Sequence, residues 1–354
     1  MKKYEAAIIG GGQAGLAMGY FLKKEKLSFV IIEKNGEIGD SWRQRYNSLV
    51  LFTPRQYSSL PGLQMRGTSD DFPTKDDMAD YLNDYVKHFD LPVMLFTNVI
   101  QLNKLPDGSF IIETNSGIVK AQQVIIAAGA FQKPYIPPLI KGGTGAFQLH
   151  SSEYRSPEEV PGGEVLIVGG GNSGAQLAVE LAKHRKVTIA VGHRMKFLPL
   201  TILGKSIFYW LEKLGLLFAG TDTFKGSWFQ KQKDPIFGKE LKTLIQNKKV
   251  DVKPKVLHVS GTEVLFGDGT QRNFESIIWS TGFVPSCEWI HIEGVVSAEG
   301  KPIHKRGITE IKGLYFIGLP WQYQRGSALI CGVGRDAEYL ASVVLSGRFQ
   351  QLRK

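Results

Sequence analysis

The chain has 354 residues, of which 43% are hydrophobic and 21% charged, and it carries a formal net charge of +10 with two cysteines. This composition is typical of a globular protein with room for two domains, and it excludes a disordered, collagen-like or disulfide-stapled chain. Since the basic residues are dispersed and form no Lys/Arg block, we expect a surface that attracts anionic cofactors and no nucleic-acid partner.

The first recognisable element is a glycine-rich loop near the N-terminus. The sequence GGGQAG at residues 10–15 follows an apolar run at residues 6–9 and precedes a helical pattern over residues 13–24. The order strand, glycine-rich turn, helix is the context that a dinucleotide-binding G-x-G-x-x-G motif requires. Two lysines ahead of the apolar run imitate a signal peptide, but this strand, loop and helix account for the whole stretch.

Each glycine of the motif has a separate physical task. Gly10 permits the tight turn, Gly12 lets the backbone approach a pyrophosphate, and Gly15 lets the helix pack against the strand. The helix N-terminus then presents free N–H groups to the phosphates. A second strand is predicted over residues 28–33 and ends at Glu33. A carboxylate there accepts hydrogen bonds from ribose hydroxyls and repels a 2′-phosphate, so this site favours FAD or NAD over NADP.

The next segment is a long loop that precedes a helix. Residues 46–62 show little helical or strand pattern. Together with the preceding residues 39–45 they contain three arginines, Arg43, Arg45 and Arg55. Long ordered loops are usually functional. A helix is predicted over residues 74–89, because a threonine cap and two aspartates begin it. A buried strand at residues 124–128 then ends at Gly129, ahead of a proline-rich linker.

A second copy of the glycine-rich loop follows in the middle of the chain. GGGNSG at residues 169–174 comes directly after the apolar run 165–168, and a helix over residues 172–183 and a strand over residues 186–191 are predicted beyond it. That strand is followed by cations and no carboxylate, namely His193, Arg194 and Lys196. Cations pair with a 2′-phosphate through charge-assisted hydrogen bonds, so we predict NADPH at this second site.

The last third of the chain completes both units. Residues 197–249 are predicted to be a largely helical insertion, whose aromatic residues are candidates for an apolar substrate entrance or for core packing. Charged residues interrupt its apolar run, which argues against a membrane span. A buried strand at residues 277–279 ends in Ser-Thr-Gly, a returning strand lies at residues 314–317, and a last helix is predicted to start near Asp336.

We therefore predict an α/β fold with two Rossmann-like dinucleotide-binding domains of the FAD/NAD(P)-binding type, the NADP domain being inserted in the FAD domain. The FAD-binding domain would comprise residues 1–157 and 284–354, and the NADPH-binding domain residues 158–283, with the insertion at about residues 197–249. A chain that binds two dinucleotides usually transfers hydride between them. It contains no C-x-x-C motif, so neither a redox cysteine pair nor a metal site is expected.

Taken together, these motifs resemble those of class B flavin-dependent monooxygenases, and most of all the small bacterial flavoproteins of that superfamily, some of which are associated with cation-efflux transporters. The resemblance covers nearly the whole chain. It rests on these segments: GGGQAG with Glu33, GDSWRQRY, TPRQYSSLPG, GGGNSG, Ala-Ala-Gly at 127–129, Ser-Thr-Gly at 280–282, and the terminal GLYFIGLPW and GSALICGVGRDAEYLA.

The resemblance implies an NADPH-dependent flavoprotein monooxygenase. In that family reduced FAD reacts with O2 at its C4a atom, and the resulting peroxyflavin transfers one oxygen atom to a sulfide or amine, or to a ketone. Two features depart from the family pattern. Of the fingerprint F-x-G-x-x-x-H-x-x-x-Y/W only the last two residues, His150 and Tyr154, are present, and Phe-Thr-Pro at residues 52–54 replaces the asparagine of N-oxygenating members. Sulfide oxidation and Baeyer–Villiger chemistry are therefore as well supported as amine oxygenation.

The candidate site residues follow from the motifs and, for the flavin contacts of Trp42 and Arg43, from the resemblance. The predicted FAD contacts are Gly10, Gly12, Gln13, Ala14, Gly15, Glu33, Lys34, Trp42, Arg43, Gly129, Gly318 and Asp336. The predicted NADPH contacts are Gly169, Gly171, Asn172, Ser173, Gly174, His193, Arg194, Lys196, Thr281 and Gly282. Asn172 and Ser173 could equally cap the helix alone, and His150 links the two domains or is a satisfied structural residue. No side chain is an evident catalytic base, because the cofactor supplies the chemistry.

Two alternatives remain open at this point. One is an NADPH-dependent flavin reductase that passes electrons to a quinone or a protein, and the other is a redox partner of a metal-ion transporter. The expected partners are a small-molecule substrate and O2, in a cytoplasmic protein for which a homodimer is one option. The sequence leaves the substrate, the strictness of NADPH over NADH and the oligomeric state undetermined.

Overall fold

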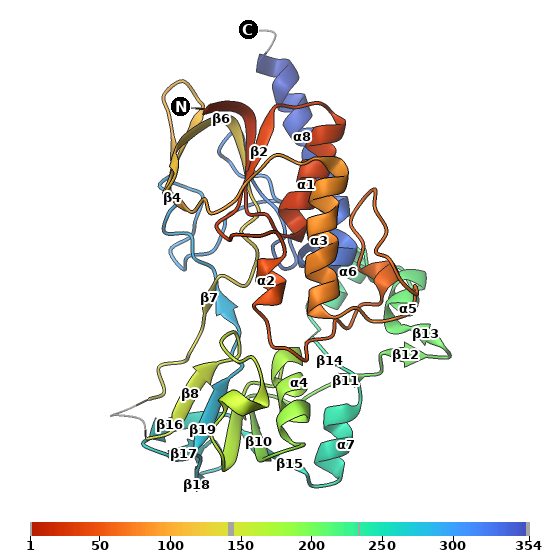
Figure 1. The fold of residues 1–354 in the computed structure, drawn as a ribbon, viewed down its shortest axis with the longest axis vertical. Coiled ribbons are helices and arrows are strands. Elements are labelled where there is room, and N and C mark those ends of the chain that lie inside the picture. Colours follow the sequence, from red (N-terminus) through yellow and green to blue (C-terminus); the bar gives the residue numbers. More distant parts are fainter. Residues whose placement is uncertain (1, 141–144, 233, 352–354) are drawn as a thin grey trace.

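The computed structural model describes residues 2–140, 145–232 and 234–351. Two largely parallel β-sheets lie one above the other along the long axis of the molecule, and each has helices against one face (Figure 1). The first sheet has the order β3-β2-β1-β6-β5-β4, and β21 also pairs with β6. Its strands are β1 (Lys2–Ile9), β2 (Phe29–Ile32), β3 (Val93–Met94), β4 (Val99–Lys104), β5 (Phe110–Thr114), β6 (Gly117–Ile126) and β21 (Leu314–Phe316).

Alternating side chains of the first sheet face two different layers. Ala6 and Ile8 of β1 pack under the helices α1 (Gln13–Lys24), α3 (Lys75–Phe89) and α8 (Ile330–Gln351). The intervening Ala7 and Ile9 pack on the other side, against residues of β4, β5 and the segment 287–296. Such burial on both faces explains why β1 is apolar throughout its second half.

The register of the first sheet brings three strand ends to one line. Ile9 lies opposite both Ile32 of β2 and Ile126 of β6. The residues that follow these strands therefore emerge side by side at the carboxyl edge, where open α/β sheets bind ligands.

The second sheet repeats this arrangement. Its order is β15-β10-β9-β19-β8, and every pair is parallel. The strands are β8 (Phe147–His150), β9 (Glu164–Val168), β10 (Lys186–Val191), β15 (Val250–Pro254) and β19 (Ser276–Trp279). Helices α4 (Asn172–Leu181) and α7 (Glu240–Gln246) pack on one face. The antiparallel strands β16 (Val256–Ser260), β17 (Glu263–Phe266) and β18 (Gln271–Asn273) cover the other.

The connections between the sheets run side by side. β7 (Lys133–Pro134) on the way out pairs with β20 (Phe283–Val284) on the way back, and the two lie between the halves of the molecule in Figure 1. β21 then returns to the first sheet. β8 lies within the residues expected for the first unit, yet it hydrogen-bonds to β19 of the second sheet.

Three local expectations can be compared with the structure. The predicted cap of α3 is confirmed, since the Thr74 hydroxyl accepts the Asp77 N–H and the Asp77 carboxylate accepts the Thr74 N–H. The last helix begins at Ile330 and not near Asp336. Gly332 and Gly334 in its first turns have low helix propensity, but they do not prevent a buried helix from forming. The insertion at residues 197–249 is not largely helical. It holds three seven-residue helices, α5 (Ile207–Lys213), α6 (Phe224–Gln230) and α7, separated by two-residue strands and turns.

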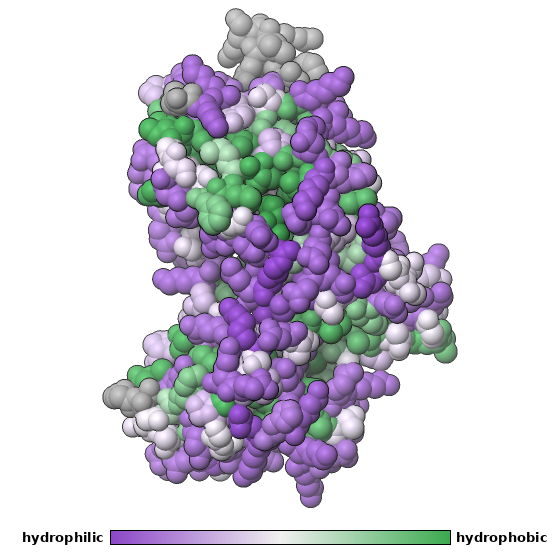
Figure 2. Space-filling model, in the orientation of Figure 1, coloured by the Kyte–Doolittle hydropathy of each residue, from purple (hydrophilic) through white to green (hydrophobic). Residues whose placement is uncertain are grey.

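The surface combines charged and apolar areas. Figure 2 shows apolar surface at the edge where β12 (Thr201–Ile202), β13 (Lys205–Ser206) and α5 lie, and Leu203 at the tip of this hairpin is 87% exposed. Among the described residues, no helix combines the length and the apolarity needed to cross a bilayer.

The contact between α1 and the end of β1 generates a stability prediction. A Cβ atom at Gly15 would overlap the backbone carbonyl of Gly10, whereas a Cβ at Gly12 would meet no atom within 4 Å. We expect Gly15→Ala to lower the free energy of unfolding by about 1–3 kcal/mol, a cost typical of overpacking, and Gly12→Ala to lower it by much less. Urea unfolding of the flavin-free protein measures both; equal stabilities would contradict this packing.

Candidate functional site

A cavity of about 370 Å³ opens at the carboxyl edge of the first sheet, a size typical of ligand pockets, which span roughly 300–1,000 Å³. Eight of the twelve residues predicted to bind FAD line it: Gly10, Gly12, Gln13, Ala14, Glu33, Lys34, Gly129 and Gly318. Gly129 follows β6 and Gly318 follows β21, so the aligned strand ends bring residues from distant parts of the chain to one cavity.

The first glycine-rich loop leaves open space where a pyrophosphate would lie. Gly10 has a φ of +112°, and a Cβ there would lie 2.5 Å from the carbonyl oxygen of Ala127. Gly15 is packed against Gly10 as described above. Gly12 has nothing within 4 Å of an added Cβ, so its backbone faces the cavity. The donors of the α1 N-terminus point toward this space, and the loop therefore fits a dinucleotide phosphate.

The Glu33 carboxylate is held in place by two backbone N–H groups. Its side chain is only 8% exposed, and its two carboxylate oxygens accept the N–H groups of Gly11 at 2.6 Å and Asn35 at 2.9 Å. Each oxygen keeps lone-pair capacity for a further donor. The geometry matches the expectation that this carboxylate accepts hydrogen bonds from ribose hydroxyls.

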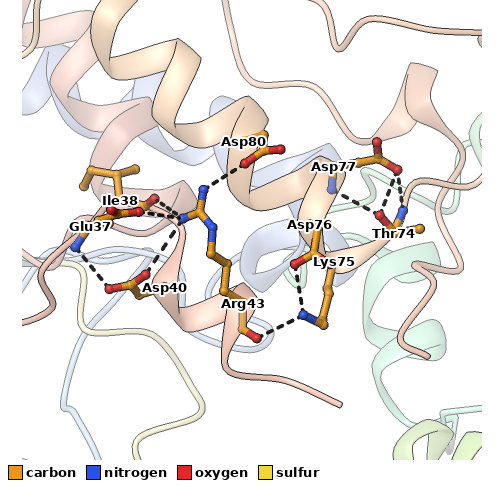
Figure 3. Close-up of polar contacts among 9 residues, drawn as sticks. All are labelled: Glu37, Ile38, Asp40, Arg43, Thr74, Lys75, Asp76, Asp77 and Asp80. Carbon is orange, nitrogen blue, oxygen red and sulfur yellow. Dashed lines mark hydrogen bonds and ion pairs between the residues drawn. The ribbon is translucent and has the colours of Figure 1, made fainter. Parts of the chain in front are cut away.

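Trp42 and Arg43 lie outside the residues that line the cavity. They belong to α2 (Asp40–Arg43), a helical turn that packs against α3. Figure 3 shows the Arg43 guanidinium turned toward carboxylates, with Asp80 at 2.8 Å and Glu37 and Asp40 farther away. In this structure Arg43 joins α2 to α3, and its flavin contact stays a prediction.

Asp336 also lies away from the lining of the cavity. It is 1% exposed in the second turn of α8, and burial raises the pKa of its carboxyl against the opposing effect of Arg306. The Arg306 guanidinium is stacked between the rings of Tyr323 and Tyr339, 3.7 Å from each centroid. Asp336 therefore lies in a buried polar cluster beneath the start of α8.

The second glycine-rich loop has the same construction as the first. Gly169 has a φ of +119°, and a Cβ there would overlap the carbonyl of Ser280. A Cβ at Gly174 would overlap the carbonyl of Gly169, and one at Gly171 would meet nothing within 4 Å. This loop thus presents a second open cradle at the N-terminus of α4.

Two polar residues of this loop bond to other parts of the protein. The Asn172 side chain donates to the carbonyl of Pro235 at 3.1 Å and accepts the N–H of Phe237 at 2.9 Å. It therefore holds β14 (Ile236–Phe237) against α4. Ser173 lies beside the Tyr46 hydroxyl, which also donates to Gln176 of α4. Neither the phosphate role nor the capping role predicted for Asn172 describes these contacts.

The cations expected to bind a 2′-phosphate are free to do so. His193, Arg194 and Lys196 follow β10 and are exposed. In the part of the chain that the structure describes, no carboxylate forms an ion pair with any of the three. The positive charge at this edge of the second sheet is therefore not neutralised by the protein itself.

The residues after β19 connect the second sheet to the crossing strands. The Thr281 hydroxyl donates to the carbonyl of Tyr135, and the Gly282 carbonyl accepts from His150 Nε2 at 3.0 Å. The His150 Nδ1 accepts the N–H of Ser152 at 3.2 Å, and burial lowers the pKa of His150, so this ring is a satisfied neutral imidazole. Tyr154 is fully buried and donates to Glu180 of α4. His150 thus bonds to a residue that follows β19, and Tyr154 bonds to α4.

Several cavity residues were not predicted, because only tertiary structure brings them there. Thr97 and Asn98 arrive because β3 pairs with β2 and the Thr97 N–H donates to the carbonyl of Glu33 at 2.8 Å. Gln132 and Ser286 come from the two crossing segments and bond to each other at 2.6 Å. None carries a motif signal.

Comparison with known proteins gives a consistent picture. Residues 7–198 match the family model described as pyridine nucleotide-disulphide oxidoreductase. A CzcO-like oxidoreductase of Geobacillus kaustophilus is 52% identical over 97% of this chain and 98% of its own. An indole-3-pyruvate monooxygenase of Oryza sativa is 27% identical over 98% of this chain and 92% of its own. The solved flavin-containing monooxygenase of Stenotrophomonas maltophilia superposes with a TM-score of 0.84 at 27% identity, covering 98% and 99% of the two chains.

The first cradle can be tested by filling it. Gly12 has φ −79° and ψ −174°, a conformation open to any residue, so Gly12→Val should fold normally while its side chain occupies the phosphate space. We expect this variant to lose most of its bound flavin, measured as flavin absorbance per chain after purification. Gly171→Val places the same side chain in the second loop, where φ is −85°, and should retain flavin. A folded, fully flavinylated Gly12→Val protein would show that FAD binds elsewhere.

Proposed function

The chain belongs to the pyridine nucleotide-disulphide oxidoreductase family and, within it, to the flavoproteins that resemble class B flavin monooxygenases, and from this premise we propose that it is an NADPH-dependent monooxygenase that uses FAD. Its relatives support an enzyme of the oxidoreductase and monooxygenase kind, and they imply a flavin cofactor. The observation that carries the proposal is the pair of open glycine cradles, one beside a buried carboxylate and the other beside exposed cations that form no ion pair with any described residue.

We assign FAD to the first unit, residues 1–157 and 284–354, and NADPH to the second, residues 158–283. The groups that would hold FAD are the backbone donors around Gly12 and the carboxylate of Glu33, and they fit a pyrophosphate and an adenosine ribose. When bound, FAD would accept hydride from NADPH and activate O2 for transfer of one oxygen atom. The loops at the carboxyl edges of the two sheets would position the two nucleotides.

The thiols of the chain give no support to a dithiol reductase. Cys287 and Cys331 are both free, and burial raises the pKa of the Cys331 thiol to about 12. A thiol in this state forms little thiolate, which is the reactive species in disulfide exchange. Electrons that reach the flavin therefore have O2 or a diffusible acceptor as their exit.

An aromatic cluster of Phe52, Phe208 and Phe237 is a candidate for the wall of the substrate site. The rings of Phe52 and Phe237 are stacked with centroids 4.6 Å apart, and Phe208 lies 6.1 Å from Phe52. The cluster joins the loop at residues 52–54 to the insertion, and Cys331 at the start of α8 packs against it. Its apolar character favours an uncharged organic substrate such as a thioether or a ketone.

The preference for NADPH can be tested at Arg194. A charged hydrogen bond contributes roughly 1.5–3 kcal/mol, so Arg194→Ala should weaken NADPH binding by about tenfold to a hundredfold and leave NADH nearly unchanged. Anaerobic reduction of the flavin at increasing cofactor concentration gives both dissociation constants. An equal loss for the two cofactors would mean that Arg194 does not bind the 2′-phosphate.

Oxygenation is tested by its stoichiometry. In the balanced reaction one thioether, one O2, one NADPH and one proton give one sulfoxide, one water and one NADP⁺. We expect sulfoxide whose oxygen comes from labelled O2, formed in proportion to NADPH consumed. Cys331→Ala should still form sulfoxide, since a thiol with a raised pKa forms little thiolate and takes no part in the reaction. Hydrogen peroxide as the sole product, together with fast turnover with a quinone, would favour the reductase instead.

A further inference from the structure

Arg45 is a half-buried cation for which the structure provides no counterion among the described residues. Its guanidinium lies over two aromatic rings, 5.2 Å from the centroid of Phe131 and 5.6 Å from that of Phe283. Within the same part of the chain it forms no ion pair, and its side chain has no hydrogen-bond partner there. Burial lowers the pKa of Arg45, and the charge of Arg155 acts in the same direction, whereas the neighbouring Tyr46 raises the pKa in part. Burying an uncompensated charge is costly, so this arrangement calls for an anion.

The main chain next to Arg45 is fastened to the helix of the second glycine-rich loop. Tyr46 is buried, and its hydroxyl donates to the side chain of Gln176 in α4. The Gln176 amide in turn donates to the carbonyl of Val50 at 3.3 Å. The Tyr46 hydroxyl also lies beside Ser173, in the first turn of α4. These contacts hold Arg45, a residue of the first unit, near the helix N-terminus of the second.

The two rings around Arg45 come from the carboxyl edges of both sheets. Phe131 follows β6 and lines the first cavity. Phe283 begins β20, four residues after β19 ends at Trp279. Arg45 therefore lies between the carboxyl edge of the first sheet and that of the second.

The neighbouring titratable groups do not neutralise Arg45. His150 is neutral, and the positive charge of Arg45 is one of the influences that lower its pKa. The Arg155 guanidinium donates to the carbonyls of Ser152 and Tyr154 and adds a second positive charge. The charge of Arg155 is close enough to Arg45 to lower its pKa, so the two guanidinium groups add to the positive potential around Arg45.

We propose that Arg45 binds the pyrophosphate of the nicotinamide dinucleotide held at the second glycine-rich loop. This inference rests on the proposed function, because it deepens the assignment of that loop. A guanidinium fork donates two parallel hydrogen bonds to phosphate oxygens, and pyrophosphate at the N-terminus of α4 is the anion that the loop geometry admits. Since Arg45 belongs to the first unit, the contact ties the nucleotide to both units and directs its nicotinamide end toward the first cavity.

Two properties distinguish Arg45 from Arg194. The pyrophosphate is common to NADPH and NADH, so Arg45→Ala should weaken both cofactors by the same factor, about tenfold to a hundredfold. The same variant should weaken the binding of 2′-phospho-ADP-ribose, which contains the pyrophosphate, and leave the binding of adenosine 2′-monophosphate, which has no 5′-phosphate, unchanged. Arg45→Lys keeps the charge without the fork and should recover part of the affinity.

The experiment is calorimetric titration of the flavin-loaded protein with these two fragments, followed by anaerobic flavin reduction with NADPH and with NADH. Arg66→Ala is the matched control, because Arg66 is an exposed arginine of the same loop region whose side chain makes no polar contact with the described residues. It should behave as the wild type. Flavin content per chain shows that each variant is folded.

The outcomes separate the two proposals. If the wild type and Arg45→Ala bind 2′-phospho-ADP-ribose equally well, the proposed role of Arg45 is overturned and the nucleotide assignment stands. A loss confined to NADPH would place Arg45 at the 2′-phosphate and also overturn it. If the wild type binds neither fragment, both the nucleotide assignment and the proposed role of Arg45 are overturned. A failure to oxygenate, with reduction by NADPH intact, affects only the proposed reaction.

Discussion

The architecture depends on one backbone contact that occurs twice. In each unit the first glycine of the loop lies against a carbonyl of a neighbouring strand end, Ala127 or Ser280, and the last glycine lies against the carbonyl of the first. No side chain fits at these points, so the helix can approach the sheet closely only there. The middle glycine is then left open to solvent space. Close packing on two sides and openness on the third are what turn a strand–helix junction into a phosphate cradle.

The two units share this construction and differ in electrostatics. At the first, a buried carboxylate accepts two backbone N–H groups and is fixed before any ligand arrives. At the second, cations on a surface loop lack carboxylate partners within the described residues. A fixed anion suits ribose hydroxyls, whereas exposed cations suit a phosphate that arrives with its own charge. The same fold can therefore hold two different dinucleotides without changing its backbone.

The contacts between the units use side chains that look like ligand-binding residues in the sequence. Asn172 holds β14, whose Phe237 stacks on Phe52 of the first unit. Tyr46 reaches α4 in the opposite direction. The helix of the second loop is thus joined to the aromatic cluster through Asn172 and to the first unit through Tyr46.

The sequence by itself determined both cradles, the strands and helices around them, the place of Glu33 directly after β2 and eight of the residues that line the first cavity. These features are local, since each depends on residue types at fixed spacing within one strand–turn–helix unit. The use of Arg43 in an ion-pair cluster, of Asn172 as a strand anchor and of Ser286 and Thr97 in the cavity was decided by tertiary structure. So was the start of α8 at Ile330, where burial outweighs the low helix propensity of glycine. A polar side chain bonds to whichever partner the fold brings within reach, and spacing along the chain carries no information about that partner.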